Sequence, residues 1–132
     1  MAAKSVLVIG HNWRMRKLIQ ANLEAFGLEV QGAVNGHHGL CLLDKHRPDL
    51  ILLDTDVPGM EVTYLLDRLQ DHVSLPVPII VLCAEPPSRL LNQNGQAISY
   101  LLKPFAALTL LEQVGRSLGG TLENEGRAAQ DG

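Results

Sequence analysis

Short runs of large apolar residues alternate with helix-patterned segments along this chain, and this alternation limits its fold more than any other feature. Each run is four or five residues long, and most consist almost entirely of Val, Ile and Leu. Such runs are typical of strands that are buried on both faces of a sheet. They predict five strands, at residues 6–9, 30–34, 50–53, 79–82 and 98–102.

The segments that follow these runs carry apolar residues at the spacing of one helix face. After the third run, for example, Val62, Leu65 and Leu66 follow the i, i+3, i+4 pattern. Gly27 and Pro48 mark the ends of the first two helices, because glycine favours a helix C-terminus and proline cannot continue a helix. The pattern predicts five helices, at residues 15–26, 36–46, 62–73, 86–94 and 107–118.

Five strands that alternate with five helices predict an α/β fold with a parallel sheet and helices on both of its faces. Right-handed crossovers leave few possible strand orders. We expect the flavodoxin-like (βα)5 arrangement, a doubly wound five-stranded sheet with the order 2-1-3-4-5. In such sheets ligands bind outside the carboxyl ends of the strands, so functional residues are expected at that edge.

Length and composition are those of one small globular domain. The chain has 132 residues, and we expect the domain to span residues 5–118. Residues 119–132 are polar and rich in glycine, which predicts a disordered tail or the stub of a linker. Eleven basic and fourteen acidic residues give a net charge of −3, which argues against nucleic-acid binding by this domain.

Neither a membrane span nor an export signal is apparent in the sequence. The longest unbroken apolar stretch, residues 79–84, is far below the roughly 20 residues that cross a bilayer. The first residues lack the charged leader and long apolar core of a signal peptide. Only two cysteines, Cys41 and Cys83, occur, and both lie in apolar segments. A reducing, cytoplasmic location is therefore the expectation.

Polar residues follow the predicted strands and are expected to meet at one edge of the sheet. Asp54 follows the most apolar strand, where a buried carboxylate is costly unless its charge is compensated. Lys103, which follows the last strand, is its expected partner. An ion pair with a purely structural role is the alternative. The residues at these strand ends are Gly10, His11 and Asn12; Asp54, Thr55 and Asp56; Cys83 and Ala84; Lys103 and Pro104.

Four segments, in this order and spacing, resemble the receiver domain of two-component response regulators. They read VLVIGHNW, RPDLILLDTDVPGM, PIIVLCA and YLLKPF, and the resemblance extends from about Ser5 to Leu118. It implies that Asp54 accepts a phosphoryl group from a histidine kinase or a phosphotransfer protein. It also implies that Lys103 contacts the phosphoryl group, that the Lys103–Pro104 bond is cis, and that Tyr100 is the aromatic residue of the family's switch.

The same resemblance implies an active-site Mg²⁺, with the backbone carbonyl of Asp56 among its ligands. Family members normally carry two acidic residues after the first strand, but Gly10 and His11 stand at those positions. Mg²⁺ prefers oxygen ligands, which neither residue's side chain supplies. Asn12, Asp54 and the Asp56 side chain are the remaining candidate oxygen donors. We therefore expect Mg²⁺ to bind weakly or not at all, in an atypical, pseudo-receiver-like domain.

Cys83 is a second departure from the family pattern. Most receivers carry serine or threonine at this position, and its hydroxyl contacts the phosphoryl group, so the resemblance implies a phosphate-contacting role for Cys83. A thiol is a weaker hydrogen-bond donor than a hydroxyl. One alternative is a transition-metal site made of His11, Asp54, Asp56 and Cys83, although these residues lack the close spacing of a zinc motif. The other is a packed, unreactive thiol.

Two main functions follow. In the first, the domain is a signalling switch rather than a turnover enzyme: Asp54 is phosphorylated, and the last strand and its flanking helices contact a partner or a second copy of the chain. In the second, the chain is a phosphorylation-independent module for protein–protein interaction. A flavodoxin-like enzyme or nucleotide binder is a weaker third candidate, because no glycine-rich phosphate loop is present.

Overall fold

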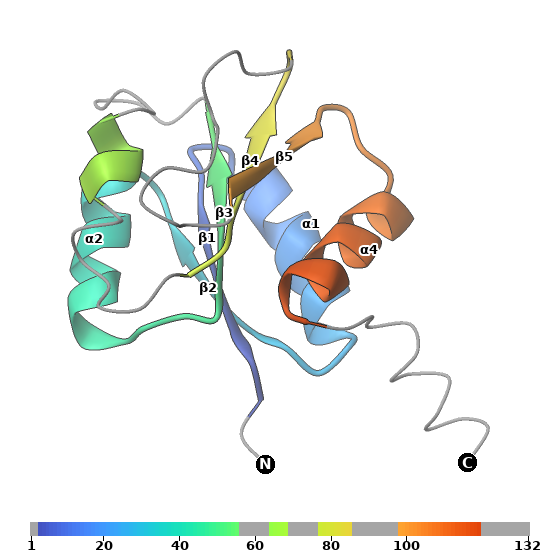
Figure 1. The fold of residues 1–132 in the computed structure, drawn as a ribbon, viewed down its shortest axis with the longest axis horizontal. Helices are drawn as coiled ribbons and strands as arrows, with labels where there is room; N and C mark the ends of the chain where they lie inside the picture. Colours follow the sequence, from blue (N-terminus) through green and yellow to red (C-terminus); the bar gives the residue numbers. More distant parts are fainter. Residues whose placement is uncertain (1–2, 56–63, 69–76, 86–97, 120–132) are drawn as a thin grey trace.

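Five parallel strands form one sheet at the centre of the molecule (Figure 1). The computed structural model describes residues 3–55, 64–68, 77–85 and 98–119. The sheet order is β2-β1-β3-β4-β5, which confirms the expected topology. The strands lie within one residue of the predicted positions: β1 (Ser5–Ile9), β2 (Glu29–Ala33), β3 (Leu50–Asp54), β4 (Ile79–Cys83) and β5 (Ile98–Leu102).

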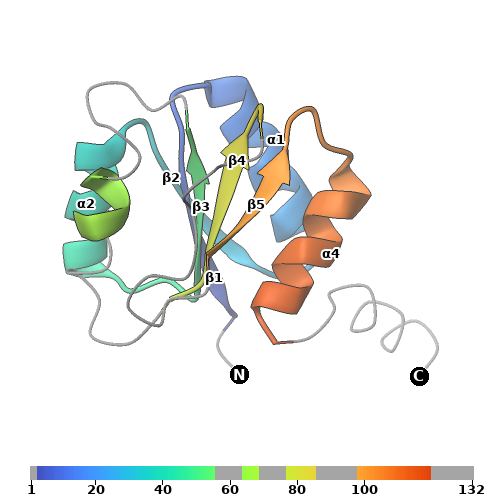
Figure 2. The same ribbon diagram turned by 45° about the horizontal axis from the view of Figure 1, so that its top comes forward.

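Three of the predicted helices are present close to their expected bounds: α1 (Trp13–Glu24), α2 (Gly36–Lys45) and α4 (Ala107–Ser117). Residues 64–68, which lie beside α2 in Figures 1 and 2, are helical and form part of the segment predicted at 62–73. The helix predicted at 86–94 lies outside the described residues. So does the expected tail, apart from Gly119.

Helices cover both faces of the sheet and bury two apolar layers. Figure 2 shows α1 and α4 on one side of the sheet and α2 with residues 64–68 on the other. Side chains alternate between the faces of a strand, so each inner strand contributes to both layers. Val6, Val8, Leu50 and Leu52 pack under α1 and α4, whereas Leu7, Ile9, Ile51 and Leu53 pack under α2.

A side-chain cap marks the start of α1, and a glycine follows its end. The Asn12 side-chain oxygen accepts from the backbone N–H groups of Arg14 and Met15, at 2.9 and 3.1 Å, and so caps α1. Gly27 follows α1 with a φ of 86°, a conformation that other residues rarely adopt. The cap places the first turn of α1 directly after β1, at the carboxyl edge of the sheet.

Candidate functional site

Asp54 and Lys103 meet at the carboxyl edge of the sheet, as the sequence predicts. The Lys103 Nζ atom donates to Asp54 Oδ1 at 2.6 Å. The side chains of Lys103 and Asp54 are 17% and 5% exposed. A buried carboxylate is tolerated when a cation and hydrogen bonds compensate its charge, and Lys103 provides both.

The ends of three strands hold this pair in place. Asp54 is the last residue of β3 and stands opposite Leu82 of β4 in the parallel register. The backbone N–H of Lys103 donates to the carbonyl of Cys83 at 2.8 Å, which ties the residue after β5 to the end of β4. The Lys103–Pro104 bond is cis, as expected.

Gly10 lies directly against Asp54 on the side of β1. A Cβ atom added at Gly10 would lie 3.2 Å from the Cβ of Asp54 and 3.6 Å from its Oδ2. Position 10 therefore borders the carboxylate, but glycine places no oxygen there. His11, the next residue, is exposed.

The described residues supply only part of the expected Mg²⁺ site. The oxygen of Asn12, a candidate ligand in the sequence, instead caps α1. Asp56 lies outside the described residues, which leaves Asp54 as the one candidate carboxylate that the structure places at the site. Among the described residues, no three His, Cys, Asp or Glu side chains form a group able to hold a metal ion. Hence the alternative transition-metal site is not assembled from the described part of the chain, which offers Mg²⁺ one carboxylate, that of Asp54.

Comparison with known proteins identifies this arrangement. The family model of the response regulator receiver domain matches residues 6–115 of the chain. The chain belongs to the response regulator receiver family. It is therefore a receiver domain of two-component signalling, with the doubly wound five-stranded fold of that family.

Curated relatives and solved structures agree with this assignment. The response regulator DivK of Brucella anthropi is 32% identical over 119 residues, which cover 88% of this chain and 97% of DivK. The regulator PhoB of Pseudomonas aeruginosa is 31% identical and is matched over 86% of this chain, but the match spans only 51% of PhoB. Chemotaxis protein CheY4 of Vibrio cholerae has a TM-score of 0.78 at 28% identity, over 89% of this chain and 100% of that structure.

Magnesium is present in one of the similar structures. The receiver domain of the histidine kinase PA1611 from Pseudomonas aeruginosa holds a magnesium ion in its active-site cleft. It has a TM-score of 0.75 and 24% identity, over 90% of this chain and 100% of that domain. At this identity the similarity establishes the fold alone. A receiver of this fold thus binds Mg²⁺, whereas weak or absent Mg²⁺ binding by this chain stays a prediction.

Cys83 of this receiver is buried at the end of β4. It is 5% exposed, and its Sγ lies 4.0 Å from the carbonyl oxygen of Val81, at the limit of a weak sulfur hydrogen bond. Burial raises the pKa of the Cys83 thiol above its usual value of 9.0, and the nearby Lys103 ammonium opposes that shift only in part. The raised pKa favours the neutral thiol at physiological pH. The burial agrees with the packed thiol given above as an alternative, and its low reactivity stays a prediction.

This difference predicts selective alkylation of the two cysteines. With iodoacetamide at neutral pH, Cys41 is expected to react at least about tenfold faster than Cys83, because the thiolate is the nucleophile and Cys41 is exposed on α2. Peptide mass spectrometry of samples quenched over time measures both rates. In denaturant the two rates should converge. Equal rates in the folded protein would contradict the burial of Cys83.

Tyr100, the implied switch aromatic, lies on β5 and is 44% exposed. Its partner on β4 is Val81. Cys83 lies two residues further along β4, and its partner on β5 is Leu102. Because side chains alternate along a strand, Tyr100 and Cys83 belong to the same face of the sheet. The structure thus places the two residues on the same face of the sheet, and the Tyr100 side chain is partly exposed to solvent.

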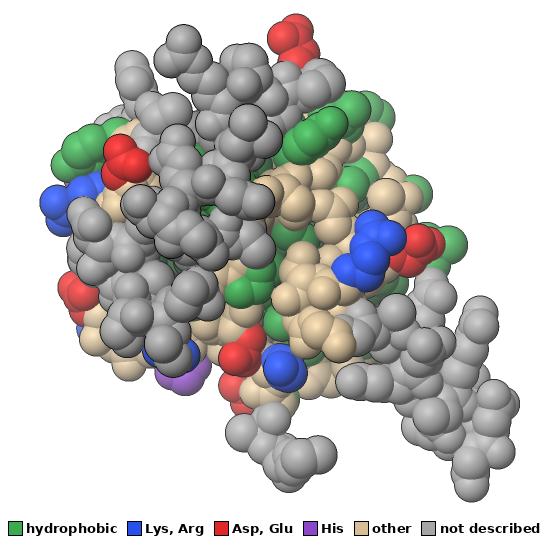
Figure 3. Space-filling view, viewed as in Figure 1, with side chains coloured by type: hydrophobic (Ala, Val, Ile, Leu, Met, Phe, Trp, Pro, Cys, Tyr) green, Lys and Arg blue, Asp and Glu red, His purple; other side chains and the backbone are tan. Residues whose placement is uncertain are grey.

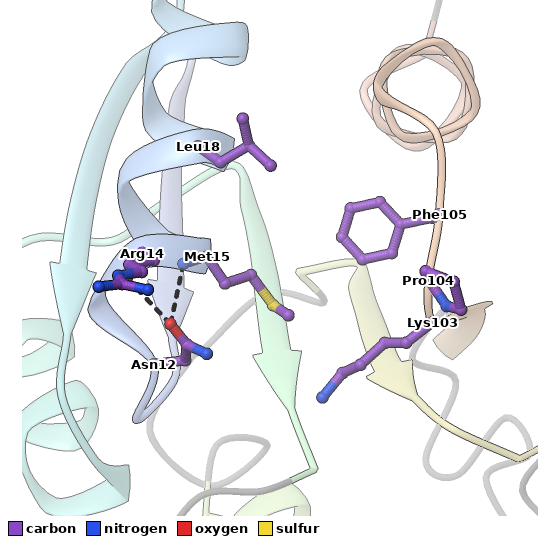
Figure 4. Close-up of a pocket in the computed structure, with 7 residues that line it drawn as sticks. All are labelled: Asn12, Arg14, Met15, Leu18, Lys103, Pro104 and Phe105. Carbon is purple, nitrogen blue, oxygen red and sulfur yellow. Dashed lines mark hydrogen bonds between the residues drawn. The ribbon is translucent and has the colours of Figure 1, made fainter.

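A largely apolar groove adjoins the site. It lies between the start of α1 and the segment that links β5 to α4, and its volume is about 500 Å³ (Figure 4). Met15, Leu18 and Phe105 line its interior, together with Asn12, Arg14, Lys103 and Pro104. In Figure 4 the Lys103 side chain extends from the end of β5 toward α1. Lys103 therefore belongs both to the groove and to the ion pair with Asp54.

Arg16 is a site neighbour that the sequence analysis did not identify. Its Nη1 atom donates to the carbonyl oxygen of Gly10, the residue that borders Asp54. One sequence signal could have identified it: the first turns of α1 contain Arg14, Arg16 and Lys17 and no acidic residue. Cations are disfavoured at a helix N-terminus, where the helix dipole is positive.

Proposed function

We propose that Asp54 is the phosphoacceptor of this receiver and that a histidine kinase or a phosphotransfer protein is the donor. The observation that supports this proposal most strongly is the 2.6 Å contact between Lys103 Nζ and Asp54 Oδ1 at the carboxyl edge of the sheet. Phosphoryl transfer needs a positioned nucleophile and positive charge beside the transferred group. Asp54 supplies the nucleophile, and Lys103 supplies the charge.

The proposed reaction is a direct displacement at phosphorus. A carboxylate oxygen of Asp54 forms a bond to the phosphorus of a phosphohistidine, while the bond from phosphorus to nitrogen breaks. Its electron pair remains on the imidazole nitrogen of the donor. The carboxylate reacts in its ionised form, so the step requires no general base. Lys103 stays next to the phosphoryl oxygens after transfer, where its ammonium group partly neutralises the added charge.

The test is phosphorylation by acetyl phosphate, with Mg²⁺ in one sample and EDTA in a second. The wild-type chain is expected to gain the mass of one phosphoryl group in at least one condition, and Asp54→Asn is expected to gain none. Asp67→Asn is the matched control, because Asp67 is an exposed carboxylate away from the strand ends. Intact-mass spectrometry measures the gain. A gain that persists in Asp54→Asn contradicts the assignment.

The absence of an acidic side chain at Gly10 and His11 supports a second candidate, a phosphorylation-independent interaction module. This alternative predicts no mass gain for the wild-type chain with Mg²⁺ or with EDTA. It also predicts that beryllofluoride, which mimics a phosphoryl group, leaves the NMR signals of Asp54 and Lys103 unchanged. Shifts confined to these strand ends exclude the alternative.

We also propose a homodimer contact through β5 and the flanking helix α4. Large apolar side chains are exposed on these elements, with Tyr100 44%, Leu102 40% and Leu108 55% exposed. Figure 3 shows hydrophobic side chains at the surface on the side of the molecule where β5 and α4 lie. Wild-type protein is expected to self-associate in sedimentation velocity, and Leu108→Ser to be more monomeric. If both variants sediment as identical monomers, this contact is wrong.

We propose that the domain acts in the cytoplasm as a molecular switch rather than as a turnover enzyme, and that it does not itself bind nucleic acid. The net charge of −3 supports the last point. Among the residues that the structure describes, no helix has the length and apolar character needed to cross a membrane. In this proposal Asp54 accepts one phosphoryl group and returns to the free carboxylate when the acyl phosphate is hydrolysed, which is the behaviour of a switch.

A further inference from the structure

The receiver carries no acidic side chain at Gly10 or His11, where β1 ends, so the charge of a phosphorylated Asp54 needs another source of compensation. A phosphoryl group carries about two negative charges at neutral pH. Lys103 carries one positive charge and already pairs with Asp54 Oδ1. A second cation on the opposite side of Asp54, toward β1, would complete the compensation without a metal ion.

Arg16 lies on that side of the site. Asp54 and Gly10 continue the alternation of Leu52 and Val8, so they belong to the sheet face that α1 covers. The Arg16 side chain lies over Gly32 of β2, because a Cβ atom added at Gly32 would lie 3.4 Å from its Cδ. Its guanidinium group then turns back toward β1 and donates to the carbonyl of Gly10.

In space, Gly10 lies between the Arg16 guanidinium group and the Asp54 carboxylate. Gly10 accepts the hydrogen bond from Arg16, and the position of its absent Cβ lies 3.6 Å from Asp54 Oδ2. Charges closer than the Debye length, about 10 Å at 0.1 M salt, interact with little screening, and partly buried charges are screened less than exposed ones. The charge of Arg16 therefore acts on the Asp54 site.

Across residues 3–55, 64–68, 77–85 and 98–119, the Arg16 guanidinium group forms no ion pair, and the one hydrogen bond of the side chain is to the uncharged carbonyl group of Gly10. The side chain also lies near the N-terminal end of α1, where the helix dipole adds positive potential. A half-buried cation in this position is favourable when an anion is nearby, and the phosphoryl group is that anion.

We infer that Arg16 takes over part of the charge compensation that a divalent metal provides in other receivers, so that Asp54 is phosphorylated without Mg²⁺. This inference rests on the proposed phosphoacceptor role of Asp54. With acetyl phosphate as donor, an Asp54 oxygen forms a bond to phosphorus, and the bond to the acetyl oxygen breaks. Acetate leaves with the electron pair. From its position beside Gly10, Arg16 stabilises the negative charge on the phosphoryl oxygens electrostatically.

The experiment measures the rate of phosphorylation by acetyl phosphate in Mg²⁺ and in EDTA for four proteins. These are the wild-type chain, Arg16→Met, Arg16→Lys and Lys17→Met. Methionine retains the aliphatic contact over Gly32 but removes the charge, and lysine restores the charge. Lys17 is exposed on the same helix and serves as the control for a lost cation. Thermal melting confirms that each variant is folded.

The wild-type rate is expected to be the same in EDTA and in Mg²⁺ within about twofold. Arg16→Met is expected to be slower by about tenfold or more, a loss of electrostatic stabilisation of the transition state. Arg16→Lys should recover most of the rate, and Lys17→Met should match the wild type. A wild-type reaction that requires Mg²⁺, or an Arg16→Met rate equal to that of the wild type, overturns the inference and leaves Asp54 as the phosphoacceptor. Absence of phosphorylation in both conditions overturns the proposed function itself.

A variant that carries the two acidic residues of other receivers tests whether the assay can detect a dependence on Mg²⁺. Gly10→Asp combined with His11→Asp places two carboxylates where other receivers carry them, next to Asp54. The added Cβ at position 10 meets Asp54 Cβ at 3.2 Å, so a small adjustment of the backbone is needed. This variant is expected to react faster in Mg²⁺ than in EDTA, unlike the wild type. A wild type that depends on Mg²⁺ as strongly as this variant contradicts the inference.

Discussion

Replacement of Lys103 by methionine is expected to lower the free energy of unfolding by about 2–3 kcal/mol. Asp54 is 3% exposed and loses the cation that lies 2.6 Å from its Oδ1 atom. Removal of one partner from a buried ion pair typically costs about 3–5 kcal/mol, because the other charge is left uncompensated. The expected cost lies at or below the lower end of that range because the Lys103 side chain is 17% exposed and water reaches part of the pair.

The double variant Asp54→Leu with Lys103→Met is expected to recover most of this loss, since apolar residues of similar volume often replace a buried ion pair without cost. Urea denaturation of both single variants and of the double variant gives the coupling energy. Lys17→Met, at an exposed position on α1, serves as the control and should change stability by less than about 0.5 kcal/mol. A Lys103→Met loss no larger than that of the control contradicts a role of the pair in stability.

The pairing of Asp54 with Lys103 was predictable because parallel strands place their carboxyl ends at one edge of a sheet. The strands themselves were predictable because both of their faces are buried. Leu50 and Ile51, for example, belong to opposite apolar layers and are both 0% exposed. A run of apolar residues with no polar alternation is the direct result of such burial.

The contacts of Asn12 and Arg16 were not predictable from the same reasoning. Sequence chemistry made Asn12 a candidate metal ligand, but its oxygen is used by the first N–H groups of α1, which otherwise lack partners. The contact of Arg16 with the Gly10 carbonyl depends on where α1 lies on the sheet. Hydropathy patterns identify which residues are buried, but they do not specify individual side-chain hydrogen bonds.

Gly39 shows a packing constraint that sequence patterns also do not reveal. It lies inside α2, where glycine is a poor helix former, and it is buried against β1. A Cβ atom at this position would lie 2.6 Å from Ile9 Cδ1 and 2.9 Å from Ile9 Cγ1. Ile9 is itself 0% exposed, so its side chain has little space to move. Glycine therefore allows α2 to lie closer to the sheet than a residue with a Cβ atom would, unless the Ile9 side chain shifts.

Gly39→Val is accordingly expected to lower the free energy of unfolding by about 3 kcal/mol, the upper range for overpacking of a core. Gly39→Ala should cost about 1–2 kcal/mol, because the gain of about 1 kcal/mol in helix propensity offsets part of the steric cost. His37→Ala, at an exposed position on the same helix, is the control and should be nearly neutral.

Shortening the Ile9 side chain tests whether steric contact with Ile9 causes the cost of Gly39→Ala. In an Ile9→Val background the nearest atom, Cδ1, is absent, so the loss caused by Gly39→Ala should fall below about 1 kcal/mol. Urea denaturation of the two single variants and the double variant measures the difference. If Gly39→Ala costs the same with and without the Cδ1 atom, the contact with Ile9 is not the cause. If Gly39→Ala instead stabilises the wild-type chain, helix propensity outweighs packing and α2 lies further from β1 than the structure shows.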